Sequence, residues 1–215
     1  MLKSTNPLLS AIFLMASLCF VIAGCNPPAS EAQAEASAAE PVMTNEDYVL
    51  NGEKLVLVGG CKDCHSPKTF ENGIMGFDDS RFLSGHPQGS QLPPIDTRAL
   101  EPGYWLTFSP DLTAFVGPWG MSFARNLTPH ETGIKGWTEE VFIKAMRTGK
   151  HMGVEQGRPI MPPMPWEILS EMSDEDLKSI YMYLNTIPAI DNRVPDPKSP
   201  DEVRAMAEAG TSKKM

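Results

Sequence analysis

The chain has 215 residues, of which 41% are hydrophobic and 21% charged, and this suits one globular domain with appended segments better than two full domains. Its formal net charge is -9 and no basic stripe runs along it, which argues against a nucleic-acid partner. An acidic chain favours solubility and attraction to basic patches on a partner protein.

The first 24 residues predict an export signal. Lys3 precedes a mostly apolar run that ends at Cys25, and this run is too short to indicate a transmembrane span. Its ending, VIAGC, resembles a bacterial lipobox, in which the cysteine sulfur takes a diacylglyceryl group. An uncleaved anchor and an ordinary secretory cleavage site are the alternatives. We expect residues 1–24 to be removed as a lipoprotein signal peptide and Cys25 to carry the lipid.

Residues 25–44 comprise this cysteine and a segment rich in Ala, Glu, Ser and Pro. Such a composition buries too little surface to order itself, so we predict a flexible tether that holds the domain near a membrane; a short Ala/Glu helix is the alternative. Cys19 leaves with the signal, and only Cys61 and Cys64 remain as thiols of the mature domain.

A helix is predicted from about Thr44 to Gly60. Thr44, Asn45 or Asp47 can cap its start, apolar residues recur along it, and the pair Gly59–Gly60 ends it.

The sequence GGCKDCH that follows contains Cys61, Cys64 and His65. A structural zinc site needs four nitrogen or sulfur ligands, and the mature domain has no other cysteine. A redox disulfide is expected after a strand in a βαβ unit, whereas this motif follows a helical segment. Two thiols at this spacing can each bond one vinyl group of a porphyrin, while the adjacent histidine ligates the iron. Together with the export signal, the motif predicts one covalently attached haem c.

Between residues 66 and 128 the chain is rich in Gly, Pro, Ser and aromatic residues and has weak periodicity. We predict mostly loop there, with a short helix or hairpin. A further helix is predicted from about Thr138 to Gly149.

The sequence GRPIMPPMPWEIL, at 157–169, offers the iron a second axial ligand. Its prolines exclude a helix and favour an extended polyproline-like loop, in which Met161 and Met164 would project to one side, about 9 Å apart. Only one of these methionines can bind the iron. A histidine sixth ligand is the alternative, but each candidate lies in a polar loop or at a helix end, where an exposed side chain is commoner: His86, His130 and His151.

The strongest helix pattern is SDEDLKSIYMYLNTI. Ser173 can serve as N-cap with Asp176 three residues on, and Pro188 follows the helix. One apolar stripe runs along it: Leu177, Ile180, Tyr181 and Leu184. Residues 195–215 form a polar C-terminal tail, in which SPDEVRAMAEAG suggests a short helix.

The whole pattern resembles the bacterial monohaem cytochrome c family, in particular the cytochrome domains of alcohol-dehydrogenase cytochrome subunits and their single-domain relatives. The resemblance rests on GGCKDCHS (59–66), the sequence from ARNLTP to TGKH (124–151) and the sequence from MPPMPW to DNRVP (161–195). It implies an all-α cytochrome c fold over residues 45–194, with N- and C-terminal helices packed around one haem and a long irregular loop insertion at 66–128.

The resemblance also assigns the haem ligands. It implies that Cys61 and Cys64 bind the haem covalently and that His65 is the proximal ligand. A Met-Pro pair before an aromatic residue supplies the distal sulfur in such domains, which selects Met164 over Met161.

The resemblance further puts Asn126, with the NLTP sequence that it begins, and Trp137 against the haem pocket near the propionates. Arg125 or Arg158 can neutralise a propionate, although a solvated arginine explains either residue equally well.

We therefore predict a one-electron carrier with His/Met axial ligation and not an enzyme. It would be lipid-anchored on the periplasmic or cell-surface side of a bacterial membrane, with redox proteins, chiefly membrane oxidoreductases, as partners. The alternatives are an electron-accepting cytochrome subunit of a membrane-associated dehydrogenase complex, and a haem enzyme or sensor with a displaceable sixth ligand.

Overall fold

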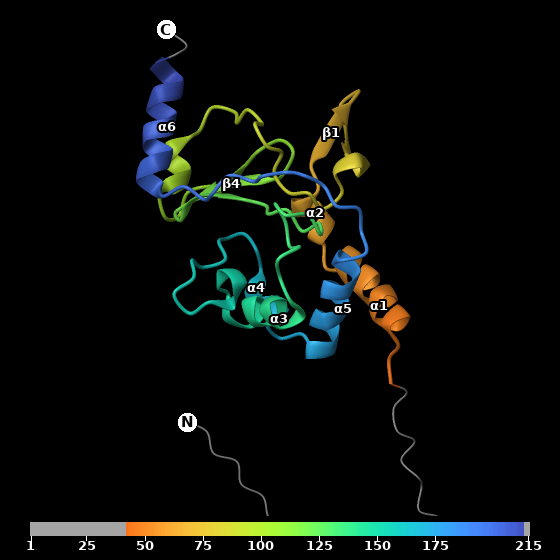
Figure 1. Cartoon of the computed structure of the whole chain (residues 1–215). Coiled ribbons are helices and arrows are strands. Elements are labelled where there is room, and N and C mark those ends of the chain that lie inside the picture. Colours follow the sequence, from red (N-terminus) through yellow and green to blue (C-terminus); the bar gives the residue numbers. More distant parts are fainter. Residues whose placement is uncertain (1–41, 213–215) are drawn as a thin grey trace, which may run out of the picture. The chain divides into compact units, whose positions relative to one another are not determined.

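The computed structural model describes residues 42–212 (Figure 1). The predicted signal peptide, Cys25 and most of the tether lie outside this part of the chain. Within residues 42–212, no helix is long and apolar enough to cross a membrane.

Three helices that the sequence predicts form one side of the fold: α1 (Asn45–Val58), α3 (Glu139–Thr148) and α5 (Asp174–Leu184). Helix α1 begins with a capping box, because the Thr44 hydroxyl accepts from the Asp47 N–H and the Asp47 carboxylate accepts from the Thr44 N–H. Helix α5 packs against both α1 and α3. The predicted helices are confirmed.

The ends of α3 and α5 follow the sequence signals as well. Thr138 caps α3, and Gly149 ends it in the left-handed conformation that favours glycine. The Ser173 hydroxyl accepts from the Asp176 N–H at the start of α5.

Helices α1 and α5 approach each other closely at Gly52. A Cβ there would lie 1.9 Å from the Ser179 carbonyl oxygen, so only glycine permits this crossing. Beside it, the Asn51 amide donates to both Asp176 and Ser179 at 3.1 Å.

These helices surround what we call the helical core. The predicted stripe of α5 faces it, with Tyr181 partly buried at its edge. Its buried residues are Val56, Leu83, Ile134, Phe142, Ala145, Met146, Leu177, Ile180, Leu184 and Ile187.

Residues 66–128 hold much more regular structure than the sequence predicts. Strands β1 (Lys68–Glu71) and β2 (Ile74–Phe77) form an antiparallel hairpin. A second antiparallel sheet has the order β3-β4-β5. Its strands and the nearby 3₁₀ turns are β3 (Thr107–Phe108), β4 (Ala114–Gly117), β5 (Gly120–Phe123), η1 (Asp79–Arg81) and η2 (Thr97–Leu100).

The prediction of an all-α fold with an irregular insertion is therefore wrong in this region, which contains two small sheets. The strands have at most four residues, and every residue of β4 and β5 is buried. Strands that are covered on both sides do not alternate apolar and polar residues, so the period that identifies a strand is absent from the sequence.

Helix α6 (Pro200–Ser212) packs against η2 and β5, and Figure 1 shows it beside this sheet. The Met121 and Lys198 backbones exchange two hydrogen bonds at the edge of β5, of 2.9 and 2.8 Å. Together these elements enclose what we call the sheet core, whose buried residues are Ala99, Leu100, Ala114, Val116, Met121, Phe123, Val194 and Val203. The domain boundaries proposed from the sequence stay a prediction.

Candidate haem site

The Cys-x-x-Cys-His motif forms a single helical turn, α2 (Cys61–His65), directly after α1. Both cysteines are free thiols, three residues apart, and residues at this spacing lie on one face of a helix. Burial raises the pKa of the Cys61 thiol to about 11 and also raises the pKa of Cys64. Cysteines that exchange disulfides have a lowered pKa, so these thiols do not have the character of a redox dithiol.

The ring of His65 is buried and held in one orientation. Its Nδ1 atom lies 2.7 Å from the Arg125 carbonyl oxygen, which can only accept, so Nδ1 carries the proton. The lone pair is then on Nε2, the nitrogen available to a metal. Burial lowers the pKa of His65, which keeps the ring neutral. His65 therefore has the tautomer and charge that an iron ligand needs.

Lys68 is a residue of this site that the sequence analysis missed. Its buried ammonium donates to three backbone carbonyl oxygens of the motif, those of Asp63, Ser66 (2.7 Å) and Lys62 (3.5 Å). It also lies 4.6 Å from the centroid of the Phe77 ring. These contacts place a cation at the C-terminal end of α2, where carbonyl groups lack helical partners. No motif in the sequence distinguishes this lysine from a solvated one.

The methionine loop, which we define as residues 157–166, is not extended as predicted. The Met164 N–H donates to the Met161 carbonyl at 3.3 Å, so the chain turns between the two methionines. The prolines exclude a helix, but they suit turns as well as extended chain. After the turn, the short helix α4 (Trp166–Leu169) begins.

The two methionines differ in their surroundings. Met164 and Cys61 are both among the partly buried side chains that pack against the helical core, and Met161 is not one of these side chains. The methionine that the family resemblance selects is thus the one that contacts the same apolar cluster as the cysteine motif.

The three other histidines have protein partners. His86 is buried, contrary to the expected exposure, with Nδ1 2.7 Å from the Thr113 hydroxyl. The ring of His151 meets Trp137 edge to face at 5.6 Å, in the short 3₁₀ turn η3 (His151–Gly153). His130 Nδ1 lies 2.9 Å from the Thr132 hydroxyl.

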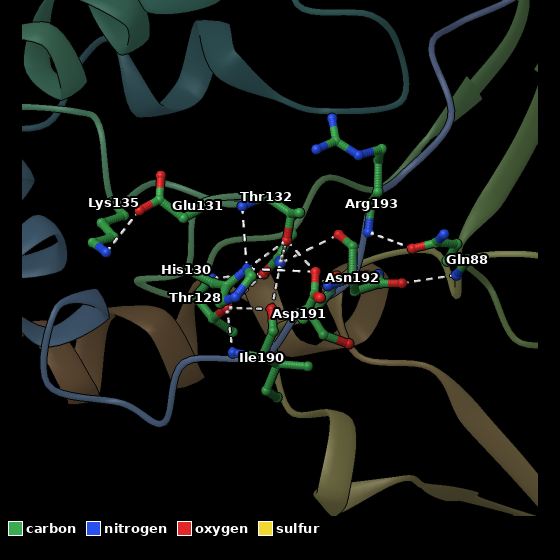
Figure 2. A network of polar contacts seen from close by, with 12 residues as sticks. Gln88, Thr128, His130, Glu131, Thr132, Lys135, Ile190, Asp191, Asn192 and Arg193 are labelled. Carbon is green, nitrogen blue, oxygen red and sulfur yellow. Dashed lines mark hydrogen bonds and ion pairs between the residues drawn. The ribbon is translucent and has the colours of Figure 1, made fainter.

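Asn126 is buried and belongs to a polar network. Its Oδ1 accepts from the Thr128 N–H (2.9 Å) and hydroxyl (2.8 Å), and its amide donates to the Ile190 carbonyl (2.9 Å). Figure 2 shows the adjoining contacts of Thr128, Ile190 and Asn192, where Asn192 accepts from the Gln88 N–H at 2.7 Å. The network joins Gln88 and residues 126–128, all within the insertion, to residues 190–192. The expected place of Asn126 and Trp137 in the haem pocket stays a prediction.

A cationic cluster lies next to His65, formed by Arg125 and Arg158, with the ring of His151 beside them. Burial, and then the charge of Arg158, lower the pKa of Arg125; burial and both arginines lower the pKa of His151. Asp196 is the acidic neighbour of this cluster, 3.9 Å from the Arg125 guanidinium. Positive charge exceeds negative charge among these groups, which suits an anion.

The donor set fits an iron in a porphyrin better than a protein-held metal ion. No group of three or more His, Cys, Asp or Glu side chains within residues 42–212 is placed to hold a metal. One neutral imidazole, two thiols and a thioether near an apolar core are instead the groups by which proteins hold haem.

Comparisons with known proteins agree with this chemistry. A scan against models of protein families finds no match. The chain is 28% identical over 169 residues to the fructose dehydrogenase cytochrome subunit of Gluconobacter japonicus, which covers 78% of this chain. It is 28% identical over 142 residues, or 66% of the chain, to the gluconate 2-dehydrogenase cytochrome c subunit of Pantoea cypripedii. It is 33% identical over 91 residues, or 40% of the chain, to the cytochrome c subunit of the quinone-type alcohol dehydrogenase of Gluconobacter oxydans.

These matches span 26%, 23% and 18% of the three relatives, so the chain corresponds to about a quarter of their length or less. They confirm the resemblance that the sequence motifs indicate. The chain is therefore a homologue of the cytochrome c subunits of dehydrogenases.

Proposed function

We propose that this protein is a one-electron carrier that holds one covalently attached haem c outside the cytoplasm. The observation that carries the proposal is the Cys61–His65 turn, with two free thiols on one face and a neutral imidazole whose Nδ1 is bonded to a backbone carbonyl. The relationship to cytochrome c subunits supports the same cofactor.

In this proposal Cys61 and Cys64 form thioether bonds to the haem, and His65 is the proximal iron ligand through Nε2. When bound, the haem takes up and releases single electrons, and a thioether ligand favours its ferrous form and so raises the reduction potential. Met164 is the distal ligand, because it packs against the helical core together with Cys61. Met161 is the alternative.

Lys68 has a supporting role. Its bonds to the carbonyls of Asp63 and Ser66 keep the cysteine turn in one conformation before and after haem attachment. Its fixed positive charge near the motif would favour the reduced state.

The cationic cluster is suited to the haem propionates. The backbone carbonyl of Arg125 holds the ring of His65, and its guanidinium would pair with a propionate. One residue would therefore orient both the proximal ligand and a propionate. Arg158 adds positive charge beside Arg125, and Trp137 contacts the ring of His151.

We further propose a lipid anchor at Cys25, which keeps the carrier at a bacterial membrane on its periplasmic or cell-surface side. Its partners would then be membrane oxidoreductases, because tethering raises the effective concentration of such partners. A second function, an electron-accepting subunit of a dehydrogenase complex, is favoured by the dehydrogenase cytochrome subunits to which the chain is similar.

The test is the absorption spectrum of the haem-loaded protein, made in cells that attach c-type haem. We expect a reduced c-type spectrum and, in the oxidised protein, the weak far-red absorbance typical of His/Met ligation. Met164→Ala should abolish this absorbance, and the matched variant Met161→Ala should keep it. A high-spin oxidised spectrum with ready binding of CO or peroxide would instead favour a haem enzyme or sensor.

The free carrier and the dehydrogenase subunit can be distinguished by which proteins co-purify with the chain. Purification of the tagged, lipidated protein from membranes by mild detergent should yield a stable complex with a dehydrogenase if the chain is a subunit. A free carrier should separate from its partners at moderate salt.

A further inference from the structure

Ser122, a buried residue of β5, links the sheet of the insertion to the methionine loop. Its hydroxyl donates a hydrogen bond of 2.5 Å to the Pro162 carbonyl oxygen. The same hydroxyl oxygen accepts from the Trp119 indole N–H at 3.2 Å. A hydroxyl has one proton, and the indole can only donate, so the proton of Ser122 is directed at Pro162.

Pro162 lies inside the turn that joins the two methionines. Prolines have no N–H, so residues 162, 163 and 165 donate no backbone hydrogen bonds, and the turn contributes few bonds to its own stability. The Met164 N–H bonds to Met161 within the turn, and Ile160 N–H bonds to Gly149 before it. The contact from Ser122 ties the middle of this turn to a separate part of the fold.

We propose that Ser122 is a positioning residue for the sixth ligand, and that the insertion serves to hold the methionine turn against the haem. This inference rests on the proposed function, in which Met164 ligates the iron. It gives the insertion at 66–128 a role, because β5 presents Ser122 from a sheet in which every residue of β4 and β5 is buried.

The experiment compares the haem-loaded protein with its Ser122→Ala variant in an alkaline pH titration. The far-red absorbance measures how much methionine remains bound to the oxidised iron. Loss of one hydrogen bond should shift the equilibrium toward the methionine-displaced state by about fivefold, so the absorbance should disappear at lower pH. The reduction potential should fall as well, because the thioether stabilises the ferrous form.

Two further variants keep the result specific. Ser122→Thr retains the hydroxyl and should restore the pH midpoint and the potential. Trp119→Phe removes the indole donor and leaves Ser122 in place, so it should lower the pH midpoint and the reduction potential by less than Ser122→Ala does. If Ser122→Ala does not fold, Trp119→Phe provides the test in its place.

The matched control is Ser109→Ala, another buried serine of the insertion. Its hydroxyl accepts from the backbone of Ala114 and donates to Asp111, and it bonds to no residue of the methionine loop in these contacts. This variant should lower the melting temperature and leave the far-red absorbance and the potential unchanged.

Two outcomes would overturn the inference, and they are distinguishable. In the first outcome, the unaltered protein shows the far-red absorbance, and Ser122→Ala has the same pH midpoint and the same reduction potential. Ser122 is then not a positioning residue, although the proposed function stands. If the unaltered protein has no such absorbance, the proposed ligation fails and this inference fails with it.

Discussion

The helical core and the sheet core of this protein are built in different ways. The helical core is formed by capped helices with apolar stripes, and it contacts both Cys61 and Met164. The sheet core combines strands of two to four residues with a helix from the far end of the chain, and it contains none of the predicted ligands. The helices of the part that holds the cofactor thus carry local sequence signals, whereas the short strands of the sheet core do not.

The largest expected effect is a loss of stability when a cavity is made in the helical core. Leu177→Ala removes a fully buried side chain from the centre of the helical core, and we expect a loss of about 3 kcal/mol in the free energy of unfolding. Denaturant unfolding of the haem-loaded protein measures it. We expect faster hydrogen exchange in both α5 and β5, because the helical core supports the whole domain; faster exchange in α5 alone would contradict this.

The counterpart in the sheet core is Val203→Ala, which removes two methyl groups from a fully buried position on α6. We expect a cost of about 2 kcal/mol. Hydrogen exchange of the β5 amides should become faster, while the amides of α5 keep their protection. Equal acceleration in both regions would show that the two cores unfold as one unit.

A smaller effect concerns the caps that made the helices predictable. Ser173→Ala removes the hydroxyl that accepts from the Asp176 N–H and should cost about 1 kcal/mol of stability, measured by thermal unfolding. Ser173→Thr retains a capping hydroxyl and should lose little. If the two variants are equally destabilised, the cap is not the cause.

The smallest expected effect is a pH dependence in the sheet region. Burial lowers the pKa of His86, and the nearby Asp111 opposes this shift. As pH falls below about 6.5, the unfolded chain takes up this proton before the folded chain does, so stability should decrease until pH reaches the lower folded pKa. Unfolding free energies from about pH 7.5 to 5 measure the slope. His86→Gln should reduce the change of unfolding free energy with pH, whereas His130→Gln should leave the contribution of His86 to this change as it is.

The sequence predicts most of the helical part because its signals are local. Thr44, Thr138 and Ser173 each precede a helix with an apolar pattern, and Gly149 ends one. The relationship to cytochrome c subunits was likewise predictable from the motif and its order along the chain.

The remaining features depend on tertiary contacts. The covered strands β4 and β5 have no alternating pattern, and the methionine turn depends on a hydrogen bond between Met164 and Met161 that proline content cannot predict. Lys68 and Ser122 acquire their partners only when the chain folds.

The pairing of Met121 with Lys198 has a consequence for the order in which the protein assembles. Of the described segments, α6 is synthesised last, so the edge of β5 stays unpaired, and the position of Val203 stays empty, until Lys198 and α6 have been synthesised. Open strand edges associate with one another. A chain truncated before Lys198 should therefore form oligomers through β5, and size-exclusion chromatography would detect them.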